Sequence, residues 1–260
     1  MRIDLYTLCY NEMDILPFVI DYWKRIPITK AIVYDNGSTD GSIEYLSQFN
    51  WIEVRHFDSQ GMNDDIQRFI KSEAWKQSKG NADYVIVCDM DEVIYSKNLG
   101  SVLKRMKDGN YNVLGCPWYM LCATERPTYT EGKLLHEISP EHWCDQYANH
   151  REEYKHLGKF MLFNPNKVYN MGYSVGCHIS YPRPSLKLME DTSGLVVSLH
   201  INKGFGEDYF VEKRKQAYKR LSIINKVKGY GYEYGWSEEK QRQWYRDNVS
   251  KSFDINTKIQ

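Results

Sequence analysis

The sequence lacks any apolar run that approaches the ~20 residues a helix needs to cross a bilayer. Its first residues also lack the apolar stretch of a signal peptide, so we expect a cytoplasmic protein with no transmembrane segment. It has no excess of charge of either sign, because 34 basic residues balance 34 acidic ones. This balance gives no indication of a nucleic-acid partner, and we expect none.

Metal-binding cysteine pairs are also absent. No two cysteines have the CxxC spacing that is typical of zinc sites. Two of the cysteines fall in apolar runs, where a free thiol behaves as a small hydrophobic group. We therefore expect reduced thiols, as in a reducing compartment. The cysteines are Cys9, Cys88, Cys116, Cys122, Cys144 and Cys177.

Strand and helix patterns alternate along the first half of the chain. Short β-branched and aromatic runs predict strands, and longer amphipathic segments predict the helices between them. This alternation is typical of an α/β fold with a mostly parallel central sheet and helices on both faces. The expected strands cover 3–9, 30–34, 51–57 and 84–88. The expected helices cover 12–25 and 63–77, and a further helix follows the turn at 35–42 and ends at residue 49.

The second half of the chain is less regular. Pro117 falls within an expected strand at 112–119 and favours an edge position or a bend there. Residues 120–160 are polar, aromatic and charged without a sustained period, as in many active-site loops. No linker is visible, so we expect one domain over residues 1–260. The remaining patterns predict a helix at 99–107, strands at 175–180 and 195–200, and C-terminal helices at 207–227 and 237–248.

Polar sequences follow three of the expected strands at their carboxyl ends, where ligands bind in parallel sheets. They are YNE at 10–12, DNG at 35–37 and DMDE at 89–92. The last places three carboxylates directly after a buried strand, where like charges repel and lose solvent. A divalent cation such as Mg²⁺ or Mn²⁺ would offset this cost through oxygen ligands. A solvated acidic turn is the other explanation.

Three segments together resemble the GT-A glycosyltransferases of the family-2-like group. They are TLCYNE at 7–12, VYDNGSTDGS at 33–42 and VCDMDE at 87–92, and the last matches the DxD metal motif of that group in its DxDE form. The match covers residues 1–120, and a weaker likeness follows at His200 and the next helix. The resemblance implies a GT-A fold with a nucleotide-binding half at 1–120, a variable, acceptor-binding half at 121–205 and a helical extension at 206–260.

The resemblance also implies which residues contact the donor nucleotide. Asp35 matches the acid that accepts a hydrogen bond from a ring N–H of the base, which favours uracil. Asn11, Glu12 and Asn36 match positions beside the nucleotide. Arg68, on the helix expected at 63–77, would approach the base or the phosphates, or else lie on a solvated helix face.

A metal site is implied by the same motifs. Asp89 matches the first acid of the DxD motif, near the ribose and the metal, and Asp91 matches the second, a direct metal ligand. His200 would complete the shell of the metal or the diphosphate, with His178 as the second choice. A structural histidine is the other explanation for His200. The implied cofactor is Mn²⁺ or Mg²⁺.

An inverting transferase needs a carboxylate that takes the proton of the acceptor hydroxyl. We assign this role to Asp145 first and to Glu141 second, because the aromatic neighbours Trp143 and Tyr147 could stack on a sugar. A solvated loop carboxylate is the alternative for each. Further candidates in the same segment are Glu137, Glu152 and Glu153.

The resulting hypothesis is a metal-dependent, inverting glycosyltransferase of the hexosyltransferase type. It would move a sugar from a nucleotide-sugar donor, a UDP-sugar by preference, to a hydroxyl of a glycan or lipid-linked glycan, as in polysaccharide biosynthesis. Lys203 and the basic run at 213–215 would touch the diphosphate or an anionic lipid, or lie on a solvated helix face. A peripheral membrane contact is compatible with this.

Two alternatives stay open. One is a nucleotidyltransferase that makes nucleotide-sugars, although the CYNE sequence at 9–12 lacks the glycines of the phosphate loop that such enzymes carry. The other is a non-catalytic nucleotide- or glycan-binding module on the same fold, which the intact acids at 89 and 91 argue against.

Overall fold

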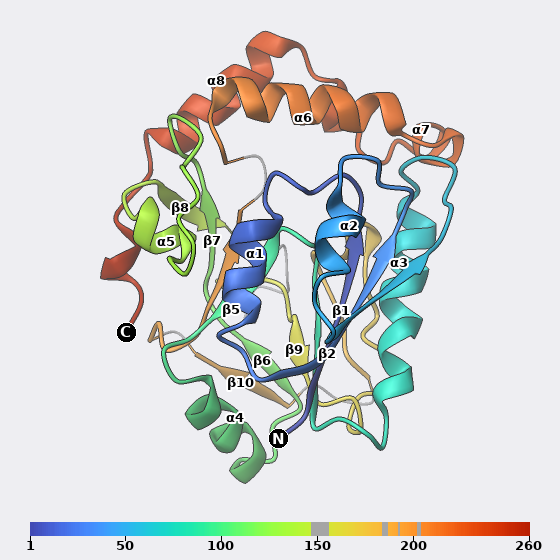
Figure 1. Cartoon of the computed structure of the whole chain (residues 1–260), viewed down its shortest axis with the longest axis vertical. Coiled ribbons are helices and arrows are strands. Elements are labelled where there is room, and N and C mark those ends of the chain that lie inside the picture. Colours follow the sequence, from blue (N-terminus) through green and yellow to red (C-terminus); the bar gives the residue numbers. More distant parts are fainter. Residues whose placement is uncertain (147–155, 184–186, 192, 202–203) are drawn as a thin grey trace.

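The computed structural model describes residues 1–146, 156–183, 187–191, 193–201 and 204–260. Its main sheet has seven strands in the order β10-β6-β9-β4-β1-β2-β3 (Figure 1). All neighbouring strands are parallel except β9, which runs antiparallel to both β4 and β6. The predicted mostly parallel α/β fold is therefore confirmed. The strands are β1 Ile3–Cys9, β2 Ile28–Asp35, β3 Ile52–His56, β4 Tyr84–Val87, β6 Val113–Gly115, β9 Leu162–Phe163 and β10 Leu188–Glu190.

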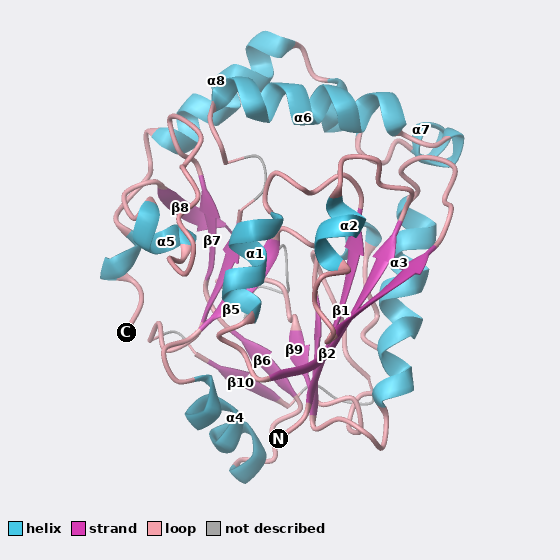
Figure 2. Ribbon diagram, viewed as in Figure 1, coloured by secondary structure: helices cyan, strands magenta, loops and turns pink. Residues whose placement is uncertain are grey.

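Hydrophobic cores lie on both faces of this sheet, because successive side chains of a strand point to opposite faces. Within β4, Tyr84 and Ile86 pack into one core, and Val85 and Val87 pack into the other. Helices α1 (Leu16–Trp23), α2 (Ser42–Leu46) and α4 (Leu99–Asp108) contribute to the first core. Helix α3 (Asp64–Glu73) continues into a 3₁₀ turn, Ala74–Ser78, whose Trp75 packs into the second core. Figure 2 shows these helices around the main sheet.

A second, four-stranded sheet has the order β5-β11-β7-β8. Its strands are β5 Glu92–Tyr95, β7 Trp118–Leu121, β8 Trp143–Gln146 and β11 Val197–His200. The prediction of one strand at 112–119 is wrong, because the chain leaves the main sheet after β6 and enters the second sheet as β7. The bend falls at Pro117, which has no N–H to donate and whose carbonyl accepts the N–H of Ser198 at 2.8 Å.

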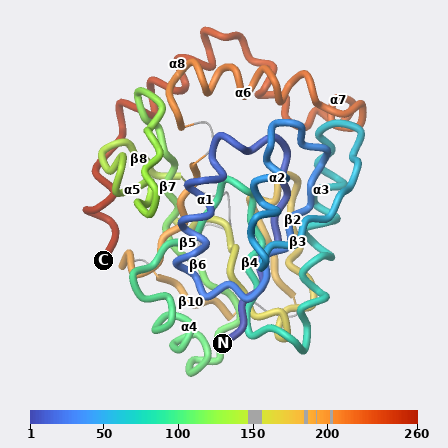
Figure 3. Tube along the Cα trace, in the orientation of Figure 1, coloured from blue at the N-terminus to red at the C-terminus, as the bar shows by residue number. Residues whose placement is uncertain are grey.

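The C-terminal helices α6 (Glu207–Arg220), α7 (Ile223–Lys228) and α8 (Glu238–Val249) lie across the end of the main sheet where β1 and β2 terminate (Figures 1 and 3). The prediction of one helix at 207–227 is wrong. Leu221 and Ser222 are extended, with ψ of 122° and 159°, and Ser222 accepts the N–H of Asn225 as the N-cap of α7. No helix among the described residues is long and apolar enough to cross a membrane.

The strand predicted at 175–180 is also wrong. The structure has a 3₁₀ turn there, Val175–Cys177. Gly176 and Cys177 have φ of 72° and 56°, in the left-handed region that a strand cannot contain. This turn brings Cys177 and His178 to the carboxyl end of the main sheet, beside the strand-end motifs.

Candidate active site

A cavity of about 250 Å³ lies at the carboxyl ends of β1 and β4, closed on one side by α6. It collects residues that are far apart in the sequence, which is the arrangement expected of a ligand site in a parallel sheet. Two of the three strand-end motifs line it directly, and the third contributes one residue, Asn36. The polar lining residues are Tyr10, Asn11, Glu12, Asn36, Asp64, Gln67, Lys71, Asp89, Asp91, Glu92, His178, His200, Lys213, Gln216, Arg220 and Tyr234.

The ends of β1 and β2 are held together by hydrogen bonds between their motifs. Asn11 has a φ of 52°, and its N–H donates to the Ser38 hydroxyl at 2.9 Å. In return its side-chain oxygen accepts the N–H of Thr39 at 2.7 Å. The N–H of Glu12 donates to the Ser42 hydroxyl at 2.9 Å. The serines and threonine of the DNGSTDGS sequence therefore fix the β1 end that lines the cavity.

Asp35 has a place that the resemblance did not imply. Its side chain is only 1% exposed and does not line the cavity. One oxygen accepts the Ser38 hydroxyl at 2.6 Å, and the other accepts the N–H of Gly37 at 3.0 Å and faces the His56 ring at 3.2 Å. The carboxylate is thus engaged inside the turn. Its neighbour Asn36 lines the cavity instead.

Helix α3 presents a polar face to the cavity, formed by Asp64, Gln67 and Lys71. These positions are spaced i, i+3 and i+7 and so lie on one side of a helix. Arg68, which we predicted at the nucleotide, lies off this face and pairs with Asp65 at 2.9 Å. Lys71 could have been predicted from the sequence, because its spacing from Asp64 and Gln67 puts all three polar side chains on one side of the helix.

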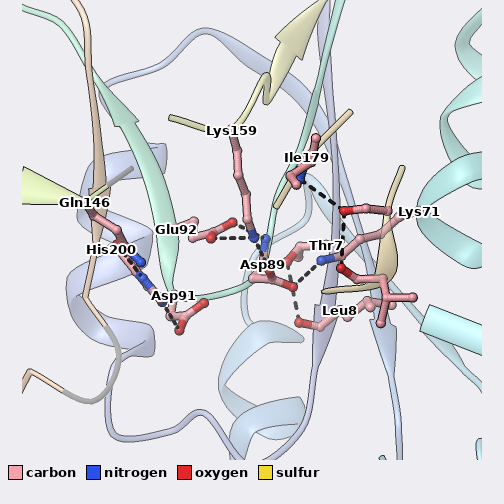
Figure 4. A network of polar contacts seen from close by, with 12 residues as sticks. Thr7, Leu8, Lys71, Asp89, Asp91, Glu92, Gln146, Lys159, Ile179 and His200 are labelled. Carbon is pink, nitrogen blue, oxygen red and sulfur yellow. Dashed lines mark hydrogen bonds and ion pairs between the residues drawn. The ribbon is translucent and has the colours of Figure 1, made fainter. Parts of the chain in front are cut away.

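Asp89 lies between two lysines, as Figure 4 shows. Lys71 pairs with one of its oxygens, and Lys159 lies 2.6 Å from the other. Lys159 is also 2.6 Å from Glu92, whose side chain is only 1% exposed. The other oxygen of Glu92 accepts the N–H of Asp89 at 3.0 Å. The last acid of the DxDE motif therefore holds the turn, and both oxygens of Asp89 are paired with ammonium groups at the edge of the cavity.

These charges hold one another in their ionised forms. Burial alone would raise the pKa of the Asp89 carboxyl, but Lys159 and Lys71 hold it well below its ordinary value. Burial would lower the pKa of the Lys159 ammonium, but Asp89 and Glu92 raise it. The same Lys159 charge, together with burial, lowers the pKa of His178 to about 2, so that ring is neutral.

Asp91 and His200 form the second polar pair of the cavity (Figure 4). The Nε2 atom of His200 lies 2.9 Å from a carboxylate oxygen of Asp91. Its Nδ1 atom lies 2.9 Å from the side-chain oxygen of Gln146, and its ring stacks on Trp118 at 5.6 Å between centroids. The N–H of Ile201 donates to the Asp91 carbonyl at 2.8 Å, which ties β11 to the DxDE turn.

This pair fits a divalent cation that is shared with a substrate. The described residues contain no group of three or more His, Cys, Asp and Glu side chains placed to hold a metal. The Asp91 oxygen and His200 Nε2 lie at hydrogen-bonding distance, 2.9 Å, which is also close to the ~3 Å between neighbouring ligands of an octahedron with ~2.1 Å bonds. Gln146 accepts from Nδ1, as partners of metal-bound histidines do, which leaves Nε2 facing the carboxylate. Mg²⁺ sites of this kind take their other ligands from phosphate and water.

The structure places neither predicted catalytic carboxylate at the cavity. Asp145 precedes Gln146 in β8, so the alternation of a strand turns its exposed side chain away from His200. Glu141 is exposed and borders a separate hollow of about 390 Å³. Glu137 accepts the N–H of Leu134 at 2.8 Å, capping the short helix α5 (Leu135–Ile138). Tyr147, Glu152 and Glu153 lie outside the described residues.

The basic run at 213–215 divides among three environments. Lys213 lines the cavity, and its ammonium donates to the Asn11 carbonyl at 3.2 Å. Arg214 is buried and donates to the Glu233 carbonyl at 2.6 Å. Lys215 pairs with Glu238 at 2.8 Å on the surface. Only the first of the three reaches the site, and Lys203 lies outside the described residues.

The model of glycosyl transferase family 2 matches residues 5–187, so the chain belongs to this family. Its fold is the GT-A fold, and its enzyme class is that of the glycosyltransferases. No curated protein matches the chain.

Among solved structures, the chain is similar to S. aureus TarS 1–349, with 12% identity over 87% of this chain and 68% of that one and a TM-score of 0.46. The same TarS fragment in complex with UDP-GlcNAc gives 13% identity over 87% and 69%, with a TM-score of 0.41. A longer S. aureus TarS chain gives 15% identity over 84% and 39%, with a TM-score of 0.41. At these scores the likeness carries no argument about function.

Proposed function

We propose that the protein is a metal-dependent, inverting glycosyltransferase that moves a sugar from a UDP-sugar to a hydroxyl of a glycan or lipid-linked glycan. The observation that carries the proposal is the Asp91–His200 pair, which opens on the same cavity as three basic side chains, Lys71, Lys213 and Arg220. Carboxylate and imidazole on one side and fixed cations on the other are what a metal-bound diphosphate requires.

Different cavity residues would bind different parts of the donor. Asp91 and His200 would hold Mn²⁺ or Mg²⁺, which when bound neutralises the charge that develops on the leaving diphosphate. Lys213 and Arg220, from α6, line the same cavity and would bind phosphate oxygens directly. Lys71 pairs with Asp89 and also lines the cavity, so it would shift part of its charge from that carboxylate to the substrate.

We assign Asn11, Glu12 and Asn36 to the nucleoside, as the family resemblance implies, and they line the cavity at the ends of β1 and β2. The preference for uracil, the inverting course and the acceptor rest on the family resemblance, and the cytoplasmic location stays a prediction. We propose a structural role for Asp35, within its turn, and no role in proton transfer for Asp145 or Glu141. The division of the chain into donor, acceptor and helical parts stays a prediction.

Turnover of a panel of nucleotide-sugars, with Mn²⁺ and with EDTA, tests this function. We expect slow release of UDP from a UDP-sugar with Mn²⁺ and none with EDTA, measured by chromatography. UDP with Mn²⁺ at about 100 times its Kd should stabilise the fold by about 2.7 kcal/mol and raise the melting midpoint by roughly 5–10 °C.

Three outcomes would count against the proposal. Turnover in EDTA equal to that in Mn²⁺ would show that the reaction does not need a metal. Formation of a nucleotide-sugar from a nucleoside triphosphate and a sugar phosphate would favour a nucleotidyltransferase. UDP protection without turnover of any donor or acceptor would favour a binding module.

A further inference from the structure

Helix α7 exposes its apolar side chains and buries a polar one, Asn225. Ile223 and Val227 are 81% and 82% exposed, and Ile224 is 46% exposed. Asn225, in the middle of the same helix, is fully buried. A surface helix of a globular protein has the opposite pattern, with its apolar stripe toward the core. This inversion indicates that the exposed side of α7 has a partner of its own.

The orientation of α7 is fixed by specific contacts. The side chain of Asn225 accepts the N–H of Asp64 at 3.0 Å and donates to the Asp64 carboxylate at 2.9 Å. Lys228 pairs with Asp65 at 2.6 Å. These bonds join α7 to the first turn of α3, and α7 lies at the edge of the C-terminal layer (Figure 1).

The chain segment that carries these apolar side chains is basic, although Glu212 and Glu233 flank it and Asp65 pairs with its Lys228. Every charged residue from Lys213 to Tyr232 is a lysine or an arginine. Lys219 and Lys226 have exposed side chains beside the apolar ones, and so does Lys228, which is bound to Asp65. Two tyrosines of this segment, Tyr218 and Tyr232, are 48% and 70% exposed. Exposed aliphatic and aromatic groups in a lysine-rich segment are typical of surfaces that bind at a membrane interface.

We propose that residues 218–232 form a docking surface for an anionic lipid bilayer, here called the α7 surface. Ile223, Ile224 and Val227 would enter the headgroup region, and the lysines would bind the anionic headgroups. Arg220, just before α7, lines the cavity. A bilayer on the α7 surface would therefore lie beside the active site. This goes beyond the proposed transfer reaction and does not depend on the sugar that is moved.

A second copy of the chain fits the α7 surface less well than a bilayer. Two copies related by a two-fold axis would bring the same lysines face to face, and like charges across an interface are unfavourable. The apolar part consists of a few side chains on a six-residue helix, whereas stable interfaces bury about 800 Å² per partner.

Co-sedimentation with vesicles tests the proposal. We expect the protein to bind vesicles of phosphatidylcholine with 30% phosphatidylglycerol, and to bind pure phosphatidylcholine at least about tenfold less. The double substitution Ile223→Ser with Val227→Ser should weaken partitioning at least about tenfold. Lys219→Glu with Lys226→Glu should weaken it as much and abolish its salt dependence.

A matched control is Tyr169→Ser with Lys104→Glu. Tyr169 is 72% exposed and lies against Lys76 and Lys79, at the far end of α3 from α7, and Lys104 is on the surface of α4. This variant should partition like the original protein. Protection of each variant by UDP, measured separately, distinguishes a failure of the α7 surface from a failure of the proposed function. Wild-type protein that stays in the supernatant would overturn the proposal, as would α7 variants that sediment unchanged. A lipid-free dimer that Val227→Ser dissociates would assign the surface to a second copy instead.

Discussion

Replacing Asp91 by asparagine is expected to lower kcat at least about a hundredfold. The side chain keeps its size but loses the charge that would hold the cation, and the cation contributes several kcal/mol to the transition state. Each 1.36 kcal/mol corresponds to a factor of ten in rate. The measurement is initial-rate transfer or donor hydrolysis with saturating UDP-sugar and Mn²⁺. Binding of UDP in EDTA, which does not involve the cation, should be unchanged.

Asp145→Asn is the matched control for this experiment. It makes the same chemical change at the residue that we assigned as the base from the sequence, but the side chain faces away from the cavity. We expect its kcat to stay within about twofold of the original. A hundredfold loss in Asp145→Asn, or full activity in Asp91→Asn, would reverse our assignment of these two residues.

Replacing Lys159 by methionine is expected to destabilise the protein by about 3 kcal/mol and to lower its melting midpoint by roughly 10 °C. Lys159 is only 5% exposed and pairs with both Asp89 and Glu92, so its loss leaves two carboxylates close together without this ammonium. Removal of one partner from a buried ion pair costs much more than the pair contributes, because the remaining charge has lost its solvent. Denaturant unfolding at pH 7 gives the measurement.

The effect of Lys159→Met should depend on pH in one direction. The folded pKa of Asp89 lies below its ordinary value of 3.8, so the stability it contributes is complete above that value and is lost as pH falls through the folded pKa. The folded pKa of Lys159 lies above 10.5, so its contribution is lost only as pH rises through that higher value. Without the lysine, which lowers the pKa of Asp89, that carboxylate takes up a proton more easily. The difference between the two proteins should therefore shrink as pH falls from 7 toward 4.

Lys104→Met is the control for stability. Lys104 pairs with Asp108 on the exposed side of α4, where an ion pair contributes little. Its melting midpoint should not change measurably. Equal midpoints for Lys159→Met and Lys104→Met would contradict the importance of the buried charge cluster.

The main sheet and the position of the site could be predicted from the sequence. Buried parallel strands read as short β-branched runs, and their carboxyl ends must meet at one edge of the sheet. This is why the ends of β1 and β4 line one cavity as expected. Asp91 and His200, which are 109 residues apart, were assigned to one shell through the family resemblance, and they lie side by side.

The remaining site residues could not be predicted, for physical reasons. Lys159 is 70 residues from Asp89 in a segment without periodicity, so their pairing exists only in the folded chain. Asp145 lies one position before Gln146, and because one position in a strand changes the face, the sequence did not reveal which of the two side chains meets His200. Asp35 belongs to the DNGSTDGS sequence, but that sequence does not reveal that the Asp35 carboxylate accepts hydrogen bonds within its own turn.

Binding of Mn²⁺ in the presence of UDP or uridine tests the central claim most directly, with free Mn²⁺ followed by electron paramagnetic resonance. Two protein groups and a diphosphate are proposed to share the ion, so UDP should tighten Mn²⁺ binding at least about tenfold and uridine should not. His200→Ala should remove this gain. Equal affinity for Mn²⁺ with UDP and with uridine would contradict the account.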